Sequence, residues 1–300
     1  PQAFKAAIRD NTRLVFAETI GNPGLDVLDI PAVSAIAHEA SLPLMVDSTF
    51  TTPYLMQPLE LGADLIVHSA TKFLSGHGIV IGGLLVDGGK FDWDASSKFP
   101  SLSEPYAGFH NLVFTEDFGP AAFIARARKE GLRDFGACMS PTTAFHILQG
   151  METLGLRMQR HVDNTREIVS FLQQQEMVNA VAYPELEGHP DKALAGQLLP
   201  RGCGAVFTFE LKGGRAAGIA FVDALKLFSH LANVGDAKSL VIHPASTTHH
   251  RMDNDALVAA GISSGTIRLS IGLEQSADLV ADLKQGLRAA EKVASREADQ

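Results

Sequence analysis

Short apolar runs alternate with a longer amphipathic segment through the first half of the chain. The runs at 14–17, 44–46, 65–67 and 84–86 are rich in Leu, Ile, Val and Met, and they predict buried β-strands. Residues 30–40 place apolar side chains at helical spacing. Because strand-like and helix-like segments alternate, the pattern predicts a mostly parallel sheet with helices on its faces.

The segment that follows the fourth run has a different character. Residues 90–119 are rich in Ser, Pro, aromatic and turn residues, and they predict a long excursion of the kind that is often functional. A helical pattern then covers 118–132.

The hydrophobic pattern changes again at Ser140-Pro141, which is typical of a helix N-cap followed by Pro at the first helical position. Helical spacing continues nearly unbroken to about residue 175, with Gly150 and Gly155 as candidate kinks, so a long bridging helix is predicted. We therefore divide the chain into a large domain, 1–150, and a smaller α+β domain, 151–300. The elements predicted for the second domain are strands at 181–184, 205–210 and 240–242 and helices at 216–231 and 276–294.

Composition excludes several classes of protein. The net charge is −9 and no Lys/Arg-rich run occurs, which argues against a nucleic-acid partner. No apolar stretch is long enough to span a membrane. Cys138 and Cys203 form no Cys-x-x-Cys motif and are expected to be reduced, buried, cytosolic thiols. The Phe-rich stretches at 207–209 and 221–228 are expected in the core.

Lys72 is the strongest candidate for chemistry. It lies in Ser69-Ala70-Thr71-Lys72-Phe73, after a predicted strand and before a glycine-rich loop. A buried lysine can lose its proton near neutral pH and become a nucleophile, while Ser and Thr hydroxyls can hold a phosphate. Pyridoxal phosphate, an aldehyde cofactor that joins lysine as a Schiff base, would use both features. The alternative is an ordinary surface lysine after a strand.

Two further polar residues follow neighbouring predicted strands. Asp47 ends the run 44–46, where open α/β sheets bind ligands, and a pyridoxal ring needs such a carboxylate to keep its nitrogen protonated. Asp47 could instead cap a helix. Asn22-Pro23 follows the first strand and is ordinarily a turn signal. Asn, Asp and Lys after three successive strands favour a common site.

These segments resemble the pyridoxal-phosphate enzymes of cysteine and methionine metabolism over essentially the whole chain. Within that family the sequence is most similar to the O-acetylhomoserine sulfhydrylases. The family motifs are Glu18-Thr19-x-x-Asn22-Pro23, Val46-Asp47-Ser48-Thr49-Phe50 and 68–77, and the segments that point to the sulfhydrylases are 91–93, 112–120, 227–236, 240–249 and 268–274.

The resemblance implies an aspartate-aminotransferase-like (fold type I) large domain with a smaller α+β domain. It implies that Lys72 holds pyridoxal 5'-phosphate and moves protons, and that Asp47 pairs with the ring nitrogen. It also places Ser69 and Thr71 on the phosphate and Asn22 on the phenolic oxygen. Their alternative is local: the two hydroxyls would satisfy backbone groups. Glu18 could orient neighbours or pair with an arginine.

The second domain is expected to bind the carboxylate of the substrate. A planar guanidinium suits bidentate binding of a carboxylate. The resemblance gives Arg268 this role, with Ser239 assisting it; the alternative for Arg268 is a solvated strand position. Among His243, His249 and His250, the spacing lacks the pattern of common metal sites, so we expect no metal and a role at the site entrance.

The implied activity is a transferase reaction in methionine biosynthesis: γ-replacement on O-acetyl-L-homoserine by sulfide or a small thiol. Its products are homocysteine or methionine, plus acetate. Open alternatives are a methionine γ-lyase, a cystathionine γ-synthase or lyase, and a homologue that has lost catalysis. The resemblance also implies a cytoplasmic homo-oligomer, a tetramer built from dimers.

The beginning of the chain departs from the family pattern. It starts at Pro1 and enters sequence typical of the middle of a domain. In the family, a preceding portion supplies a phosphate-binding helix N-terminus, an aromatic that stacks on the ring, and an arm to a neighbouring subunit. We therefore expect the large domain to be incomplete at its N-terminus, and residues 1–300 alone to bind the cofactor poorly and to aggregate.

Overall fold

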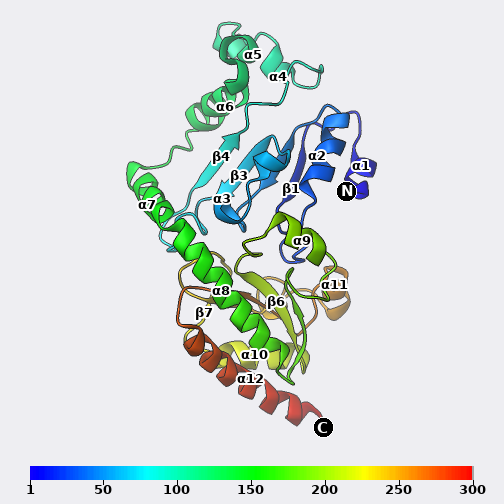
Figure 1. The fold of residues 1–300 in the computed structure, drawn as a ribbon, viewed down its shortest axis with the longest axis vertical. Helices are drawn as coiled ribbons and strands as arrows, with labels where there is room; N and C mark the ends of the chain where they lie inside the picture. The colour runs from blue at the N-terminus through cyan, green and yellow to red at the C-terminus, as the bar shows by residue number, and fades with distance from the viewer. Residues whose placement is uncertain (299–300) are drawn as a thin grey trace.

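Two β-sheets, one from each half of the chain, organise the fold (Figure 1). The computed structural model describes residues 1–298. A pair of consecutive helices runs from the first sheet along the second, so that the two sheets lie one beyond the other along the long axis. The boundary between domains at residue 150 falls within the first of these helices and stays a prediction.

The first sheet is mostly parallel, as predicted. Its strands lie in the order β1-β2-β3-β4, with parallel pairs β1–β2 and β2–β3 and an antiparallel pair β3–β4. The elements are β1 (Val15–Glu18), α2 (Ile30–Glu39), β2 (Leu44–Asp47), α3 (Thr52–Leu55), β3 (Leu65–Ser69) and β4 (Gly83–Asp87), with α1 (Gln2–Ala7) before them.

Strand register brings polar residues to one edge of this sheet. Glu18 pairs directly with Asp47, and Asp47 pairs with Val67 of β3. Parallel strands end on the same side of a sheet, so the chain leaves β1, β2 and β3 around one crevice. The carboxyl ends therefore converge because of register, although they are separated in sequence.

The excursion after β4 is a separate layer with its own aromatic cluster. Trp93 and Phe123 stack with ring centroids 5.2 Å apart, and Phe99 and Phe114 are buried beside them. The helix predicted for 118–132 is broken into a 3₁₀ turn, a short α-helix and a π-helical stretch, Ala127–Asp134. The α-helices of this layer are α4 (Pro100–Ser103), α5 (Phe114–Phe118) and α6 (Ala122–Arg126).

The predicted bridging helix is two helices, α7 (Pro141–Glu152) and α8 (Leu154–Gln173). Its start is confirmed, because Ser140 Oγ accepts a hydrogen bond from the Thr143 amide (3.1 Å). The break falls at Thr153, between Gly150 and Gly155, the two candidate kinks. The Gly150 carbonyl accepts from the guanidinium of Arg157 (2.7 Å) and from the Thr153 hydroxyl (3.4 Å), so side chains bond this carbonyl where the helix breaks.

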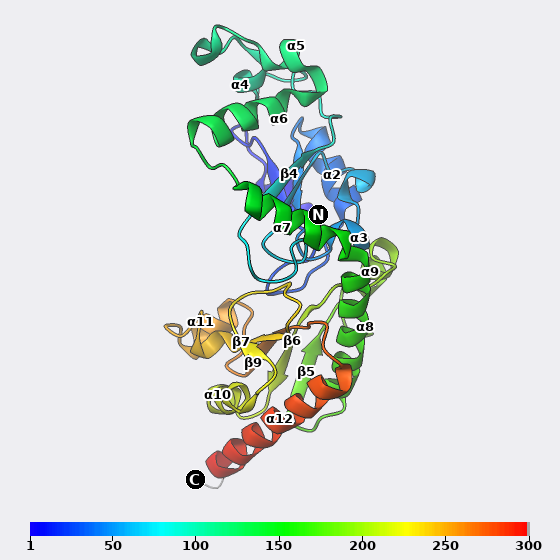
Figure 2. The ribbon, with the colours of Figure 1, turned by 90° about the vertical axis from the view of Figure 1, so that its left-hand side faces the viewer.

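The second sheet has the order β5-β6-β9-β8-β7 and is antiparallel except for the β7–β8 pair. Figure 2 shows α8, α10 and α12 around it. The Phe-rich stretches are core as expected, with Phe207 and Phe221 fully buried. The elements are β5 (Val178–Ala182), α9 (Lys192–Leu198), β6 (Val206–Leu211), α10 (Gly214–Ala224), β7 (Ser229–His230), β8 (Leu240–Ile242), α11 (Asn254–Ala259), β9 (Thr266–Ser270) and α12 (Ser276–Ala298).

The helix predicted for 216–231 ends early, at Ala224. The carboxylate of Asp282, on α12, accepts hydrogen bonds from the amides of Lys226 (2.9 Å), Leu227 (2.8 Å) and Phe228 (3.2 Å). Three successive backbone amides that donate to one side chain are not available for the helical hydrogen bonds, so the helix cannot continue through them. The chain instead turns into β7, a strand that the sequence did not predict.

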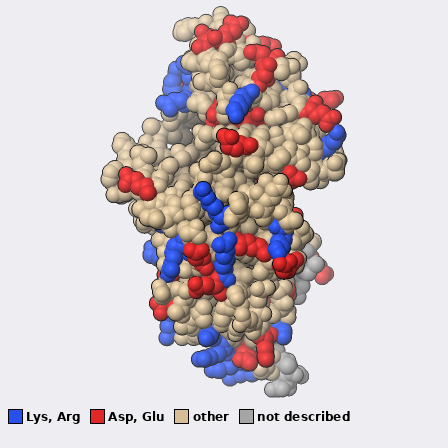
Figure 3. All heavy atoms as spheres, in the orientation of Figure 1, with Lys and Arg blue, Asp and Glu red and all other residues tan. Residues whose placement is uncertain are grey.

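The surface carries charges of both signs without a large patch of one sign on the face shown in Figure 3. No helix within the described residues has the length and apolar character that crossing a membrane requires. Both cysteines are free thiols; Cys203 is buried as expected, but Cys138 is exposed, because it lies in the loop between the π-helical stretch and α7.

Replacing Asp282 should destabilise the second half of the chain. Asp282→Ala leaves three amides without their charged acceptor, so the free energy of unfolding should fall by about 3 kcal/mol. Urea unfolding followed by circular dichroism measures the change. The control is Asp223→Ala, the same change at an exposed carboxylate of α10, which should alter stability by at most about 0.5 kcal/mol. Equal effects of the two changes would contradict the capping role of Asp282.

Candidate active site

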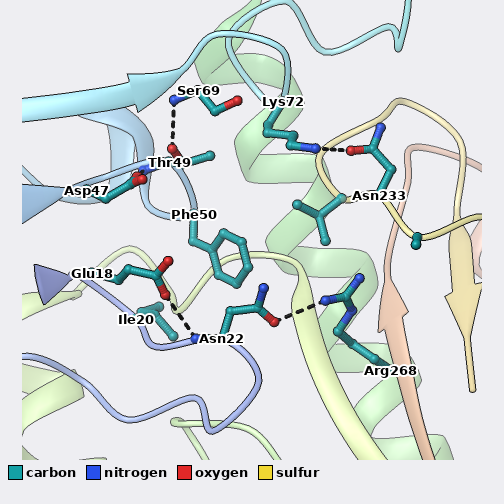
Figure 4. A pocket seen from close by; sticks show the side chains of 12 residues that line it. Glu18, Ile20, Asn22, Asp47, Thr49, Phe50, Ser69, Lys72, Asn233 and Arg268 are labelled. Atoms are coloured by element: carbon teal, nitrogen blue, oxygen red, sulfur yellow. Dashed lines mark hydrogen bonds between the residues drawn. The ribbon is translucent and has the colours of Figure 1, made fainter. Parts of the chain in front are cut away.

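A cavity of about 240 Å³ lies between the two sheets, at the carboxyl ends of β1, β2 and β3 (Figure 4). The first sheet and its loops form one wall, and β9 with the loop before β8 forms the other. The lining residues are Glu18, Ile20, Asn22, Asp47, Thr49, Phe50, Ser69, Lys72, Ala232, Asn233, Val234 and Arg268.

Five of the seven site residues predicted from sequence line this cavity, although they come from both halves of the chain. Asn22 follows β1, and Asp47 and Ser69 end β2 and β3. Lys72 stands in the turn after β3, where its amide donates to the Ser69 carbonyl (3.1 Å). Arg268 reaches the cavity from the middle of β9.

Lys72 points across the cavity toward the second half of the chain. Its Nζ donates a hydrogen bond to Asn233 Oδ1, in the loop before β8. Burial lowers the pKa of the Lys72 ammonium, and the positive charge of Arg268 lowers it further. Both effects increase the fraction of free amine at a given pH, which is what a nucleophilic lysine requires.

Asp47 is held by its own turn and does not cap a helix. Its Oδ1 accepts from the Thr49 amide (2.9 Å), while the N-cap position of α3 is Thr51. The Thr49 hydroxyl in turn accepts from the Ser69 amide (2.8 Å) and ties the end of β2 to the end of β3. The carboxylate is thereby fixed at the cavity wall with one oxygen uncommitted among the described residues.

Glu18, Asn22 and Arg268 form a chain of contacts across the cavity. The backbone N–H of Asn22 donates to Glu18 Oε2 (3.0 Å), and Arg268 Nη1 donates to the side-chain Oδ1 of Asn22 (3.0 Å). Burial raises the pKa of the Glu18 carboxyl; the bond from Asn22 opposes this rise and the neighbouring Asp47 adds to it. Burial also lowers the pKa of Arg268. Because Glu18 accepts a hydrogen bond from the backbone of Asn22, Glu18 orients the turn that carries Asn22.

Thr71 and Ser239 are not brought to the cavity. The Thr71 hydroxyl donates to the Gly82 carbonyl (3.2 Å) and accepts from the Gly82 amide (3.0 Å), which is the local alternative considered for it. Ser239 is fully buried; its hydroxyl donates to Glu274 (2.8 Å) and accepts from the Gly272 amide (2.8 Å). The geometry of the cavity thus gives no support to their predicted contacts with phosphate and substrate.

Sequence reasoning missed Thr49, Phe50 and Asn233 as site residues. Thr49 and Phe50 directly follow Asp47-Ser48, so a turn at the strand end was a usable signal. Asn233 stands 161 residues from Lys72, and no local pattern joins the two.

The histidines of the second domain do not reach the cavity lining. His243 is fully buried, with Nδ1 against the Ser246 hydroxyl (2.8 Å) and Nε2 against the Ser264 carbonyl (2.8 Å), so its expected place at the entrance was wrong. His249 and His250 make local contacts with Thr248 and Thr247. Within residues 1–298, no group of three or more His, Cys, Asp or Glu could hold a metal ion.

The uncommitted groups of the cavity fit pyridoxal phosphate. Asp47 Oδ2, Ser69 Oγ and Asn22 Nδ2 form no hydrogen bond with another described residue. They offer a carboxylate, a hydroxyl and an amide donor around a lysine of lowered pKa. A ring nitrogen, a phosphate and a phenolic oxygen require such partners.

Comparisons with known proteins agree with this chemistry. The family model described as Cys/Met metabolism PLP-dependent enzyme matches residues 1–288. The O-acetyl-L-homoserine sulfhydrylase of Leptospira meyeri is 48% identical over 297 residues, which are 96% of this chain and 67% of that protein. The homocysteine synthase of Schizosaccharomyces pombe is 47% identical, over 97% of this chain and 68% of that protein.

Solved structures give the same result. The putative O-acetylhomoserine (thiol)-lyase of Campylobacter jejuni, which contains N'-pyridoxyl-lysine-5'-monophosphate, has a TM-score of 0.91 at 35% identity and covers 96% of this chain. The cystathionine gamma synthase of Xanthomonas oryzae has a TM-score of 0.79 at 38% identity. The chain spans about two thirds of the length of these proteins. With its family motifs assembled around one cavity, the chain belongs to the pyridoxal-phosphate-dependent enzymes of cysteine and methionine metabolism.

Proposed function

We propose that the protein is an O-acetylhomoserine sulfhydrylase, a transferase that replaces the acetoxy group on the γ-carbon of O-acetyl-L-homoserine with sulfide or a small thiol. The observation that carries this function is the convergence of Lys72, Asp47 and Arg268 on one cavity. The names of the relatives from Leptospira meyeri and Schizosaccharomyces pombe support the substrate and the product.

Arg268 binds the carboxylate of the substrate. Its guanidinium is held in β9 and donates to an amide oxygen, that of Asn22. A carboxylate is a stronger acceptor than an amide and can take two parallel N–H donors, so it displaces Asn22. This exchange releases Asn22 Oδ1, while Asn22 Nδ2, which bonds no described residue, donates to the phenolic oxygen of the cofactor.

Asp47 and Lys72 have different roles in proton transfer. Bound pyridoxal phosphate supplies an electron sink for negative charge that forms on the substrate. The Asp47 carboxylate keeps a proton on the ring nitrogen, and Ser69 binds the phosphate. Lys72 Nζ would hold the cofactor, and its amine would take the proton from the substrate α-carbon. Burial and Arg268 lower the pKa of this amine, which increases the fraction of free amine that can accept a proton at a given pH.

The overall reaction is a balanced exchange at the γ-carbon. The C–O bond to acetate breaks and a C–S bond forms, so O-acetyl-L-homoserine and hydrogen sulfide give homocysteine and acetate. Methanethiol in place of sulfide gives methionine. A cystathionine γ-synthase activity is the second candidate, because the enzyme from Xanthomonas oryzae has a similar fold.

We further propose that the protein is a cytoplasmic homo-oligomer, a tetramer built from dimers. Large apolar side chains near α7 and α8 are strongly exposed, including Ile81 (87%), Leu156 (77%) and Leu148 (63%). Exposed apolar surface of this kind favours association, and closed symmetric assemblies are its usual outcome. Free thiols such as Cys138 are typical of a reducing compartment.

The first test is turnover of the full-length protein. With O-acetyl-L-homoserine and sulfide it should form homocysteine and acetate, and adding pyridoxal phosphate should give the visible absorption band of a lysine-bound pyridoxal. Lys72→Ala removes the amine, so the band should disappear and kcat should fall by about 10⁴-fold. Lys238→Ala, at an exposed lysine, is the control. Keto acid without homocysteine would identify a γ-lyase, and wild-type turnover by Lys72→Ala would end the assignment of Lys72.

The second test concerns the charge of Lys72. Because Arg268 disfavours the ammonium form, Arg268→Gln should raise the pKa of Lys72, and Arg268→Lys should leave it nearly unchanged. Acylation of Lys72 in the cofactor-free protein, followed by mass spectrometry over a range of pH, measures the midpoint. The midpoint should move to higher pH in Arg268→Gln alone; equal midpoints in the wild type and Arg268→Gln would contradict the coupling.

The third test concerns assembly. Light scattering should give the mass of a tetramer for the full-length protein. Ile81→Asp places a charge on the exposed apolar surface and should shift the mass toward smaller species. Ile219→Asp is a matched change on α10, where the side chain is 40% exposed, and should leave the mass unchanged. A monodisperse wild-type monomer would overturn the proposed oligomer.

A further inference from the structure

One face of α8 is polar and yet fully inside the molecule. Arg157, His161 and Asn164 follow one another at spacings of four and three residues, so they share one face of the helix. They are only 6%, 0% and 1% exposed. Buried polar side chains are costly unless their hydrogen bonds are made elsewhere. All three donate to backbone carbonyls outside α8, and this set is called the polar face of α8 below.

Arg157 holds the segment that directly follows Lys72. Its Nη1 donates to the Phe73 carbonyl (2.8 Å) and its Nη2 to the Leu74 carbonyl (3.2 Å) and the Gly150 carbonyl (2.7 Å). No carboxylate among the described residues forms an ion pair with it. The charge of Arg157 therefore faces backbone carbonyls, two after Lys72 and one in α7, where a buried cation usually has a carboxylate partner.

Two glycines leave room for the contact between Arg157 and the turn after Lys72. Gly76 has a φ of +69°, and a Cβ at this position would overlap the Arg157 guanidinium. A Cβ on Gly150 would likewise overlap the carbonyl of Ser75. Both glycines allow the turn after Lys72 to lie directly against α7 and α8.

Asn164 holds the segment that follows Arg268. Its Nδ2 donates to the Gly272 carbonyl (3.0 Å) and to the Glu274 carbonyl (2.9 Å). These carbonyls come just after β9, the strand that carries Arg268. Asn164 therefore holds the backbone next to Arg268, just as Arg157 holds the backbone next to Lys72.

His161 stands between the two and contacts both segments. Its Nδ1–H donates to the Ile271 carbonyl (2.6 Å), and its ring meets that of Phe73 edge to face, with centroids 5.3 Å apart. Burial lowers the pKa of His161 to about 4, so the ring is neutral at working pH and Nδ1 carries the proton. The polar face of α8 is thus continuous from one segment to the other.

We propose that the polar face of α8 is a positioning element that sets the location of Lys72 relative to Arg268. This inference rests on the proposed function, in which Arg268 holds the substrate carboxylate while Lys72 acts on the neighbouring α-carbon. A displacement of about 1 Å between two such groups can cost about a hundredfold in rate. The three residues touch neither cavity nor substrate and act through the backbone.

The test separates the two ends of the polar face in the full-length protein. Arg157→Lys cannot reach three carbonyls at once, so Lys72 should be misplaced. We expect the absorption band to form about tenfold more slowly after pyridoxal phosphate is added, and kcat to fall by about ten- to a hundredfold. The inhibition constant of propionate, a carboxylate probe for Arg268, should stay within about twofold.

Asn164→Ala should give the opposite pattern. The carboxylate side loses its anchor, so the inhibition constant of propionate should rise by about tenfold while band formation keeps its rate. The control is Arg166→Lys, on the same helix, where the guanidinium pairs with Glu185 (2.7 Å) and bonds neither segment. It should leave band formation, kcat and propionate inhibition unchanged. A helix that is merely destabilised cannot produce two opposite patterns.

Three outcomes would overturn the inference. They are a folded Arg157→Lys protein with wild-type band formation and kcat, equal losses in Arg157→Lys and Arg166→Lys, and parallel losses in the Arg157 and Asn164 variants. Circular dichroism verifies folding, and Arg157→Gln replaces Arg157→Lys in the comparison if the latter does not fold. If the wild type itself shows no absorption band, the proposed function fails instead, and the two failures are thereby distinguished.

Discussion

The site depends on one constraint: a lysine carried by the first sheet must face an arginine carried by the second. Parallel strand ends bring Asp47, Ser69 and Lys72 to one crevice, but within residues 1–298 no strand pairing joins this sheet to β9. A hydrophobic core with residues from both halves joins them, and hydrogen bonds from side chains across the gap add directional connections. Lys72 bonds Asn233, Arg268 bonds Asn22, and buried donors of α8 bond the backbone beside each. The bonds from α8 are buried, and in such a low-dielectric setting a hydrogen bond is electrostatically stronger than in water.

The electrostatics of the cavity follow from the same arrangement. Two cations, Lys72 and Arg268, share a partly buried space with two carboxylates, Glu18 and Asp47. Burial disfavours the charged form of each group that it shifts, so it lowers the pKa of Lys72 and Arg268 and raises that of Glu18. A lysine in this position is a better nucleophile, and an arginine is more ready to bind a carboxylate, than either would be in water.

Other parts of the chain are built independently of the cavity. The excursion after β4 buries its own aromatic cluster around Trp93 and Phe114, and Arg126 stacks over the Tyr106 ring at 4.2 Å. The Asp282 carboxylate ends α10 and turns the chain into β7. Such contacts fix local stability, whereas the polar face of α8 connects two distant segments. Stability and positioning can therefore be altered separately in this fold.

The sequence by itself determined the strands of the first sheet, the N-cap at Ser140, the family motifs and five of the residues at the cavity. These features depend on side chains a few positions apart, where periodicity and strand-end chemistry can be recognised directly. Only the tertiary structure decided that Asn233 meets Lys72, that the hydroxyls of Thr71 and Ser239 are committed elsewhere, and that Arg157 supports the lysine turn. Those contacts join positions as much as 161 residues apart, or depend on competition among nearby acceptors. In the sequence, a buried polar residue on a helix cannot be distinguished from a surface residue. The sequence pattern shows the polarity of the side chain but not the backbone carbonyl that the side chain will bond in the folded protein.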